Sequence, residues 1–431
     1  MIKFFSFLAL CIFGLFLLYP ASGPQAYPID GYAHTGISRL ARLLDMDSAQ
    51  IVRTLPAGGR MPYAYIRLNL MADPVDSLPL RDEAMQEELI DMLPSRGANY
   101  GIAVADISPG REPRYAAYHE DRGYQPGSVG KLAVATAIFC ELENLFVDDL
   151  EARFDLLEKR IVAGGPFAVY DHHTIPVYDT LTQKYTRKQA SESDRFSIYE
   201  WIDHMLSVSN NGAASIVWRE AILMRVFGQD YLTLTEEEAK EYFRTVDRRE
   251  LSDIANSVVN EPLRHLGISE DEWRLGTMFT RGGSNIVPPQ GGSIGSPVGL
   301  LKWLVALESG RVIDPASSLE IKRLMYMTDR RIRYAHSPSL DSAAVFFKSG
   351  SLYSCGGGPC KKYHGTKMNF MNSVAIVEQP KGDRYLVALM SNVLGRNSAY
   401  DHQLLASRID NMIRQTATSE AKLDQVRDGG E

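Results

Sequence analysis

The stretch YQPGSVGKLAVATAIF, residues 124–139, places a serine and a lysine at the start of an otherwise apolar run. The lysine, Lys131, is its only charged residue, so we expect a buried helix that begins near this position. Ser128 lies three positions before Lys131, and residues with this spacing share one face of a helix. Because a Pro-Gly pair precedes the serine, Ser128 is expected at or near the helix start.

A lysine in this setting is predicted to be a base. Burial and the positive end of the helix dipole both disfavour an ammonium ion and lower the pKa of the amine. A neutral Lys131 beside a serine hydroxyl could therefore activate Ser128 as a nucleophile. A Ser-x-x-Lys pattern also arises by chance, and a second one at residues 419–422 lies in a charged tail. The surroundings of Ser128, rather than the pattern alone, support the prediction.

A second polar segment, Ser209-Asn210-Asn211, follows the amphipathic run SIYEWIDHML. Ser209 supplies a hydroxyl that could relay a proton, and Asn211 supplies an amide that could hold a substrate carbonyl. Taken alone, such a segment is more typical of a turn or a helix cap.

A third segment, Lys348-Ser349-Gly350, lies in the strand-like run AAVFFKSGSLY. Lys348 offers a cation and Ser349 a hydroxyl for a substrate carboxylate, while Gly350 would let a ligand approach the strand closely. The backbone N–H of Ser351, with that of Ser128, could complete an oxyanion hole.

In this order, the three segments resemble the signature of the penicillin-recognising serine enzymes, the class A β-lactamases and D-alanyl-D-alanine peptidases. The resemblance covers about residues 98–416 and includes the helix SPVGLLKWLVALESG before the third segment. It implies that Ser128 is the acylated nucleophile and Lys131 its base. It also implies that Ser209 passes the proton to the leaving nitrogen, and that Asn211 and Lys348 bind the substrate.

Hydrolysis of the acyl-enzyme is a separate question, because class A enzymes use a glutamate in a Glu-x-x-Leu-Asn loop motif. Glu272-Trp-Arg-Leu275 matches the first four positions, but Gly276 stands where the asparagine is expected. Glu272 is therefore the candidate that would activate water, and Glu261 and Glu270 are weaker ones. Without such a residue, the resemblance favours a peptidase that β-lactams block.

The order of strand-like and helical runs predicts the fold class. We expect an α/β (α+β), β-lactamase-like fold: a five-stranded antiparallel sheet with flanking helices, and a second lobe that is mostly helical. The predicted strands are residues 101–108, 114–120, 343–353, 371–379 and 384–392. The hydrolase domain is expected at 95–418 with an insertion at about 142–200, after a lead-in of unknown role at 27–94 and before a polar tail at 419–431.

The N-terminal residues predict the compartment. Residues 1–26 contain one lysine followed by an apolar run from Phe4 to Tyr19, which is typical of a cleaved signal peptide or a short uncleaved anchor. We therefore expect an exported protein that is periplasmic, or anchored in the membrane and facing the periplasm. The net charge of −7 and the lack of a basic stripe argue against a nucleic-acid partner.

Two further groups of residues are candidates for a cross-link or a metal site. Cys355 and Cys360 are separated by GGGP, so they either form a small loop disulfide or remain free thiols. His172 and His173 are adjacent and are expected to point in different directions with no third ligand nearby, so no metal site is predicted. We expect no organic cofactor either, because the nucleophile, base and oxyanion donors are all supplied by the chain.

The leading hypothesis is a serine hydrolase that forms an acyl-enzyme with a β-lactam or related amide. The alternative enzyme is a D-alanyl-D-alanine carboxypeptidase or endopeptidase that acts on a peptidoglycan peptide. A hypothesis of a different class is a non-catalytic cell-wall binding protein.

Overall fold

The computed structural model describes residues 31–48, 57–61, 66, 68–95, 97–169 and 171–428. The predicted signal peptide or anchor at 1–26 lies outside these ranges. Within them, no helix is both long enough and apolar enough to cross a lipid bilayer.

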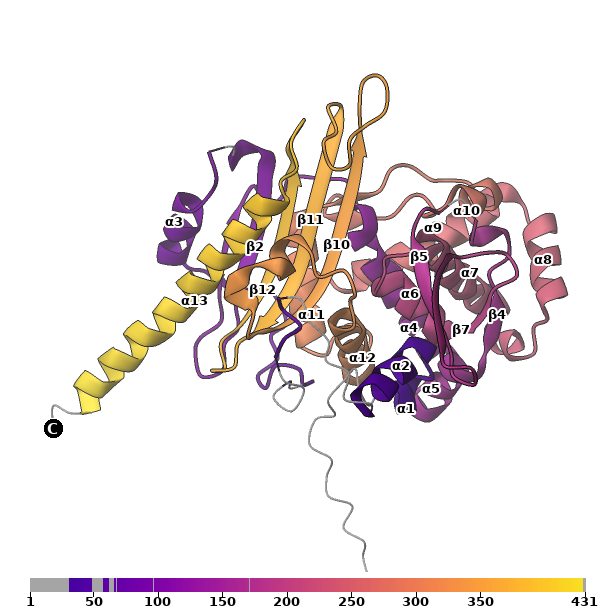
Figure 1. The fold of residues 1–431 in the computed structure, drawn as a ribbon, viewed down its shortest axis with the longest axis horizontal. Helices are drawn as coiled ribbons and strands as arrows, with labels where there is room; N and C mark the ends of the chain where they lie inside the picture. The colour runs from indigo at the N-terminus through magenta and orange to yellow at the C-terminus, as the bar shows by residue number, and fades with distance from the viewer. Residues whose placement is uncertain are drawn as a thin grey trace, which may run out of the picture.

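The centre of the protein is a six-stranded sheet with the strand order β1-β3-β2-β12-β11-β10 (Figure 1). Its strands are β1 (Leu80–Arg81), β2 (Tyr100–Asp106), β3 (Arg114–Tyr118), β10 (Ala344–Ser354), β11 (Met368–Glu378) and β12 (Arg384–Asn392). The five predicted strands are confirmed as β2, β3, β10, β11 and β12, and their neighbours pair antiparallel. The prediction missed β1, a two-residue strand that pairs parallel to β3.

The two faces of the sheet are buried in separate cores, because successive side chains of a strand point to opposite faces. On β11, Val374 and Ile376 face the core that the sheet shares with the helical lobe. Ala375 and Val377 face the other core, which α13 (Ala399–Asp428) covers along the sheet, as Figure 1 shows. The strands are therefore nearly continuous apolar runs.

The helical lobe lies beyond the β10 edge of the sheet (Figure 1). Its main helices are α4 (Lys131–Leu145), α6 (Ile198–Leu206), α7 (Asn211–Phe227), α8 (Glu236–Thr245) and α9 (Arg248–His265), with the turns η3 (Gly127–Gly130) and η5 (Gly228–Leu232). The predicted helical second lobe is confirmed.

The insertion predicted at about 142–200 contains a hairpin and short elements that pack on this lobe. They are α5 (Leu150–Lys159), β4 (Ile161–Ala163), η4 (Gly165–Phe167), β5 (Thr174–Asp179), β6 (Lys184–Gln189) and β7 (Arg195–Ser197). The segment that returns to the sheet contains β8 (Trp273–Arg274), α10 (Arg281–Ile286), β9 (Ile294–Gly295), α11 (Pro297–Glu308), α12 (Pro315–Tyr326), η6 (Arg333–His336) and η7 (Pro338–Leu340).

Side-chain caps fix the starts of two helices near the site. Ser296 caps α11, since its hydroxyl accepts a hydrogen bond from the Gly299 N–H at 3.2 Å and Pro297 occupies the first turn. Asn210 caps α7 by accepting from the Ala213 N–H at 2.7 Å. The second cap sets where α7 begins, and therefore where Asn211 is placed.

The lead-in is joined to both parts of the fold. Its elements are α1 (Gly31–Thr35), α2 (Ser38–Ser48), β1 and α3 (Glu83–Asp91), followed by the turn η2 (Gly97–Asn99). Arg39 of α2 donates to both carboxylate oxygens of Asp203 on α6, at 2.5 and 2.7 Å, and both side chains are buried. At the other end of the lead-in, β1 extends the sheet, so residues before 95 contribute to it.

Candidate active site

The start of α4 places Ser128 and Lys131 together. Ser128 lies in η3, one turn before the helix, and is half-buried. Lys131 is the first residue of α4 and is fully buried. Its Nζ lies 3.0 Å from the Ser128 Oγ, 2.7 Å from the Ser209 carbonyl oxygen and 2.7 Å from the Asn211 Oδ1. The Lys131 amine therefore contacts both the segment with Ser128 and the segment with Ser209 and Asn211.

Ser209 reaches this amine through an unusual backbone conformation. Its φ of 64° lies in the left-handed region, where a non-glycine residue costs about 1–3 kcal/mol. This conformation directs both the carbonyl oxygen and the Oγ of Ser209 toward the Lys131 Nζ, with the Oγ at 3.4 Å. The strained turn thus places a hydroxyl between the end of α6 and the start of α7.

The third predicted segment joins the same cluster from β10. The Lys348 Nζ donates to the Ser209 Oγ at 2.9 Å and to the Ser349 carbonyl oxygen at 3.1 Å. The Ser209 hydroxyl therefore lies between two buried lysines, Lys131 and Lys348. The structure brings together residues from all three predicted segments.

The loop that carries Ser128 packs directly against β10, and two glycines make this possible. A Cβ on Gly350 would lie 2.2 Å from the Pro126 carbonyl oxygen and 2.9 Å from the Val129 nitrogen. A Cβ on Gly127, whose φ is 54°, would lie 2.8 Å from the Ser351 nitrogen. The backbones next to Ser128 and around Ser351 are therefore in contact.

Two buried residues that the sequence analysis did not select hold this contact in place. Asn372 of β11 donates from Nδ2 to the carbonyl oxygens of Gln125 and Pro126, each at 2.9 Å. Arg333 donates to the Gly350 carbonyl oxygen, and to that of Asn372 at 3.1 Å. Neither belongs to a short motif, so no local sequence signal would have identified them.

Burial dominates the electrostatics of the two lysines. It lowers the pKa of Lys131 to about 7, an effect that the negative charge of Asp171 opposes and the positive charge of Arg330 reinforces. Burial also holds the pKa of Lys348 well below its usual value, and the neighbouring charges of Lys131, Arg330 and Arg333 act in the same direction. Because the pKa of Lys131 is about 7, a substantial fraction of this amine is neutral at pH 7.

Asp171, between η4 and β5, is a further site residue that sequence reasoning missed. Its carboxylate accepts hydrogen bonds from the Asn211 N–H at 2.6 Å, the Asn211 Nδ2 at 3.1 Å and the His173 Nδ1 at 2.8 Å. Burial alone would raise the pKa of Asp171, but these hydrogen bonds outweigh it and lower the pKa to about 2. Asp171 is therefore ionised at neutral pH.

The expectation that no third metal ligand lies near the two histidines was wrong. Ligand atoms of Asp171, His172 and His173 all lie within 4.8 Å of one another, and the two histidine rings lie side by side, tilted by 34° with their centroids 4.1 Å apart. The Asp171 oxygens, however, already accept the hydrogen bonds from Asn211 and His173. A metal ion would have to displace bonds that hold Asn211, so the cluster is better described as a hydrogen-bond network.

The carboxylate of Glu272 binds partners other than Lys131 and Lys348. Its carboxylate pairs with Lys302 of α11 at 2.5 Å and accepts from the Ser269 N–H at 2.7 Å. Burial raises the pKa of Glu272, but these partners outweigh that effect and the net shift is downward. Among the described residues, the hydrogen-bond partners of Lys131 are Ser128, Ser209 and Asn211, and they include no carboxylate.

Apolar side chains from the segment after Glu272 cover the start of α4. The Phe279 ring centroid lies 5.1 Å from the Lys131 Nζ. Leu275 packs closely against Gly130: a Cβ added to Gly130 would lie 2.7 Å from the Leu275 Cδ2. This cover excludes water from one side of Lys131 and contributes to the burial that lowers its pKa.

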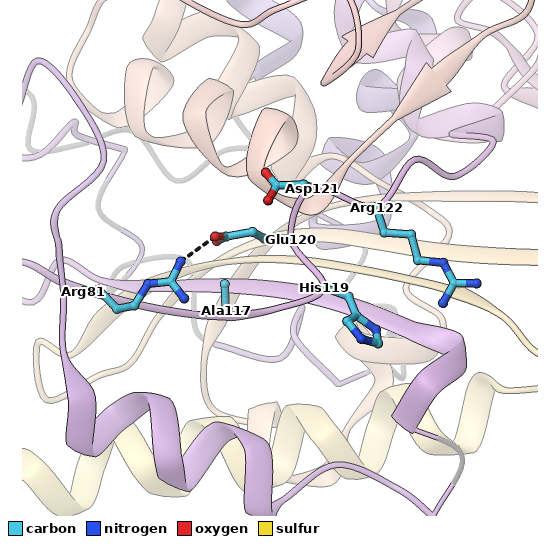
Figure 2. A pocket seen from close by; sticks show the side chains of 6 residues that line it. All are labelled: Arg81, Ala117, His119, Glu120, Asp121 and Arg122. Atoms are coloured by element: carbon cyan, nitrogen blue, oxygen red, sulfur yellow. Dashed lines mark hydrogen bonds and ion pairs between the residues drawn. The ribbon is translucent and has the colours of Figure 1, made fainter.

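Two other features lie away from this cluster. Cys355 and Cys360 form a disulfide in the β10–β11 connection, with 5.5 Å between their Cα atoms. A cavity of about 440 Å³ lies at the end of β3, where Arg81 pairs with Glu120 (Figure 2). Its lining residues include none of the predicted site residues.

A serine hydroxyl 3.0 Å from a buried amine, with a second hydroxyl between two lysines, is an arrangement that serine hydrolases use. Residues 84–416 match the profile of the beta-lactamase enzyme family, and the chain belongs to this family. It is accordingly a serine hydrolase that acts on β-lactam amide bonds.

Solved structures share the fold at low sequence identity. PBP-A in an acyl-enzyme complex with penicillin G is 13% identical with a TM-score of 0.50, and the alignment covers 78% of this chain and 100% of that one. TLA-3 extended-spectrum β-lactamase is 13% identical with a TM-score of 0.51, covering 77% and 98%. A β-lactamase from Chitinophaga pinensis is 14% identical with a TM-score of 0.50, covering 78% and 99%. No curated protein matches the sequence.

Proposed function

We propose that the chain forms an acyl-enzyme on Ser128 with a β-lactam or a related amide. The observation that carries this proposal is the position of the Lys131 Nζ, 3.0 Å from the Ser128 Oγ and in contact with Ser209 and Asn211. A base must lie within hydrogen-bond reach of the proton it removes, and this distance meets that requirement.

Acylation follows from these positions. Neutral Lys131 takes the hydroxyl proton of Ser128, and the Ser128 Oγ attacks the amide carbonyl carbon. The carbon–nitrogen bond then breaks, and the leaving nitrogen receives the proton through the Ser209 Oγ, which lies between the two lysines. The product is an ester of Ser128, which water must later hydrolyse.

Substrate binding is assigned to the residues around this centre. The N–H groups of Ser128 and Ser351 would stabilise the oxyanion, a role that the close contact of their backbones supports. Asn211 would hold the substrate amide through Nδ2. Lys348 and Ser349 would bind the substrate carboxylate, whose negative charge would favour the charged form of the lysine.

Hydrolysis of the acyl-enzyme is expected to be slow. Glu272, the candidate for activating water, is paired with Lys302. The apolar ring of Phe279 lies over Lys131 and excludes water from that side of the amine. These observations favour a second candidate function, a D-alanyl-D-alanine carboxypeptidase or endopeptidase that β-lactams acylate. Both candidates share the acylation step and differ in how long the ester persists.

Labelling with a fluorescent penicillin tests the proposal. We expect a covalent adduct with the wild type and none with Ser128→Ala. A persistent adduct together with release of D-alanine from a peptidoglycan peptide would favour the peptidase, and rapid nitrocefin hydrolysis would favour a β-lactamase. The absence of any adduct with the wild type would favour the non-catalytic binding protein.

We also propose that the protein is exported and acts in the periplasm, either free or anchored by residues 1–26. The apolar run in those residues and the Cys355–Cys360 disulfide support this proposal, since disulfides persist in oxidising compartments. Cell fractionation with N-terminal sequencing of the mature protein tests it. Recovery of the intact chain in the cytoplasm would contradict it.

A further inference from the structure

Asp171 is buried in the network that carries Lys131, although no motif contains it. Only 2% of its side chain is exposed, even though it lies in a loop. One carboxylate oxygen accepts from the Asn211 N–H at 2.6 Å, and the other accepts from the Asn211 Nδ2 at 3.1 Å. The carboxylate is thus hydrogen-bonded to both the backbone and the side chain of Asn211.

This contact determines which way the Asn211 amide faces. An ionised carboxylate can only accept hydrogen bonds, so the amide must present Nδ2 to Asp171. The Oδ1 then faces the opposite way and accepts from the Lys131 Nζ at 2.7 Å. With the amide reversed, its oxygen would face the carboxylate and its NH₂ would face the amine, and the first contact would be repulsive.

Asp171 also supplies a negative charge that acts on Lys131. The charged or titratable groups that act on Lys131 are Asp171 and His173 from this loop, Arg330 from the segment before η6, and Lys348 from β10. Burial lowers the pKa of His173 to about 4, so this ring is neutral at pH 7 and donates to Asp171. Of these groups, Asp171 alone favours the protonated form of Lys131.

We infer that Asp171 is a positioning residue: it orients the Asn211 amide and, through it, holds the Lys131 Nζ against Ser128. This inference rests on the proposed function, because it assigns a role in acylation. Asp171 contacts the base through Asn211 and has no assigned contact with the substrate. His173 in turn holds Asp171, with its Nδ1 at 2.8 Å from the carboxylate.

The test compares Asp171→Asn with Asp155→Asn in the full chain. The Asp171→Asn variant keeps the size of the side chain but loses its charge and its exclusively accepting character. Asp155 is the matched control, because the same substitution there removes a carboxylate that is 49% exposed and pairs with Lys159 of the same helix. The rate of acylation by a fluorescent penicillin is measured from pH 5 to pH 9. We expect Asp171→Asn to slow acylation by about 10- to 100-fold, and Asp155→Asn to stay within about twofold of the wild type.

A second readout does not depend on turnover. NMR of proteins labelled at the lysine side chains, with Lys131→Arg to assign the signal, gives the pH midpoint of Lys131. The midpoint should move to lower pH in Asp171→Asn, because the charge that favours the ammonium form is gone. An unchanged midpoint with an unchanged acylation rate would overturn the inference. If the wild type forms no adduct, the proposed function fails, but the Lys131 midpoint in Asp171→Asn still shows whether Asp171 acts on the amine.

A third variant covers the case in which Asp171→Asn does not fold, as judged by circular dichroism and thermal unfolding. His173→Ala removes one hydrogen bond to the carboxylate but keeps its charge. We expect slower acylation with the Lys131 midpoint unchanged, which separates the orienting role from the charge. Acylation at the wild-type rate in this variant would contradict the orienting role.

Discussion

The Nζ of Lys348 lies 2.9 Å from the Oγ of Ser209, a hydrogen bond that spans 139 positions of the chain. It joins the edge strand of the sheet to the turn between α6 and α7 in the helical lobe. The same hydroxyl lies 3.4 Å from the Lys131 Nζ on α4. The sheet and the helical lobe therefore contribute to one cluster of polar groups.

The pH dependence of acylation should follow Lys131. Burial lowers the pKa of its amine to about 7, and only the neutral amine can remove the Ser128 proton. The rate constant for acylation should therefore rise with pH up to about 7 and then level off. A rate that falls as pH rises from 6 to 8 would exclude Lys131 as the base.

The same amine should make stability depend on pH. In the unfolded chain Lys131 has the ordinary lysine pKa of 10.5. Between about pH 7 and 10.5 the unfolded state therefore binds more protons at this position than the folded state. The contribution of Lys131 to the free energy of unfolding should therefore rise with pH across this window. Lys131→Met should remove that part of the rise in denaturant titrations, and an unchanged pH profile would argue against a depressed pKa.

Gly350→Ala should damage both stability and acylation. The new Cβ would lie 2.2 Å from the Pro126 carbonyl oxygen, so the loop that carries Ser128 must move away from β10. We expect a loss of about 1–3 kcal/mol in the free energy of unfolding and a large loss of acylation rate. Gly356→Ala is the control, since a Cβ there meets nothing within 4 Å. Equal behaviour of the two variants would contradict the close contact of loop and strand.

Arg39→Met should show that the lead-in is part of the folded unit. It removes the bidentate partner of Asp203, whose side chain is 1% exposed, and leaves a buried carboxylate without its main countercharge. The free energy of unfolding should fall by about 3–5 kcal/mol. Arg60→Met is the control: its ion pair with Asp341 is about half exposed on both sides and should cost no more than about 1 kcal/mol.

Glu272→Gln should leave the lifetime of the acyl-enzyme unchanged within about twofold. In the structure its carboxylate binds Lys302 and the Ser269 N–H, which lie outside the group formed by Ser128, Lys131, Ser209 and Lys348. The lifetime is measured from the loss of fluorescent adduct after removal of free penicillin. A markedly longer lifetime in Glu272→Gln would assign the activation of water to this residue.

The parts of the site that the sequence predicted are those with a local pattern. Ser128 and Lys131 share a helix face by spacing, and the strand around Lys348 is an apolar run. Runs of apolar residues likewise made the five longer strands predictable, whereas β1 contains only two residues, both exposed, and has no such run. Short pairings of this kind are set by tertiary contacts.

Asp171 could not be predicted in this way. It lies 40 positions before Asn211, in an insertion of mixed composition, and its role depends on how that insertion folds against α7. The ion pair of Glu272 could not be predicted either. The match of Glu272 to a loop motif does not indicate that Lys302, 30 positions later, pairs with it. Both outcomes depend on contacts between distant segments.

Intact-mass spectrometry of the purified protein after incubation with penicillin G tests the central claim most directly. We expect the mass of one penicillin to be added to the wild type, located by peptide mapping on Ser128, and no addition to Ser128→Ala. Addition to Ser128→Ala at the wild-type level, or an adduct mapped to another residue of the wild type, would contradict it.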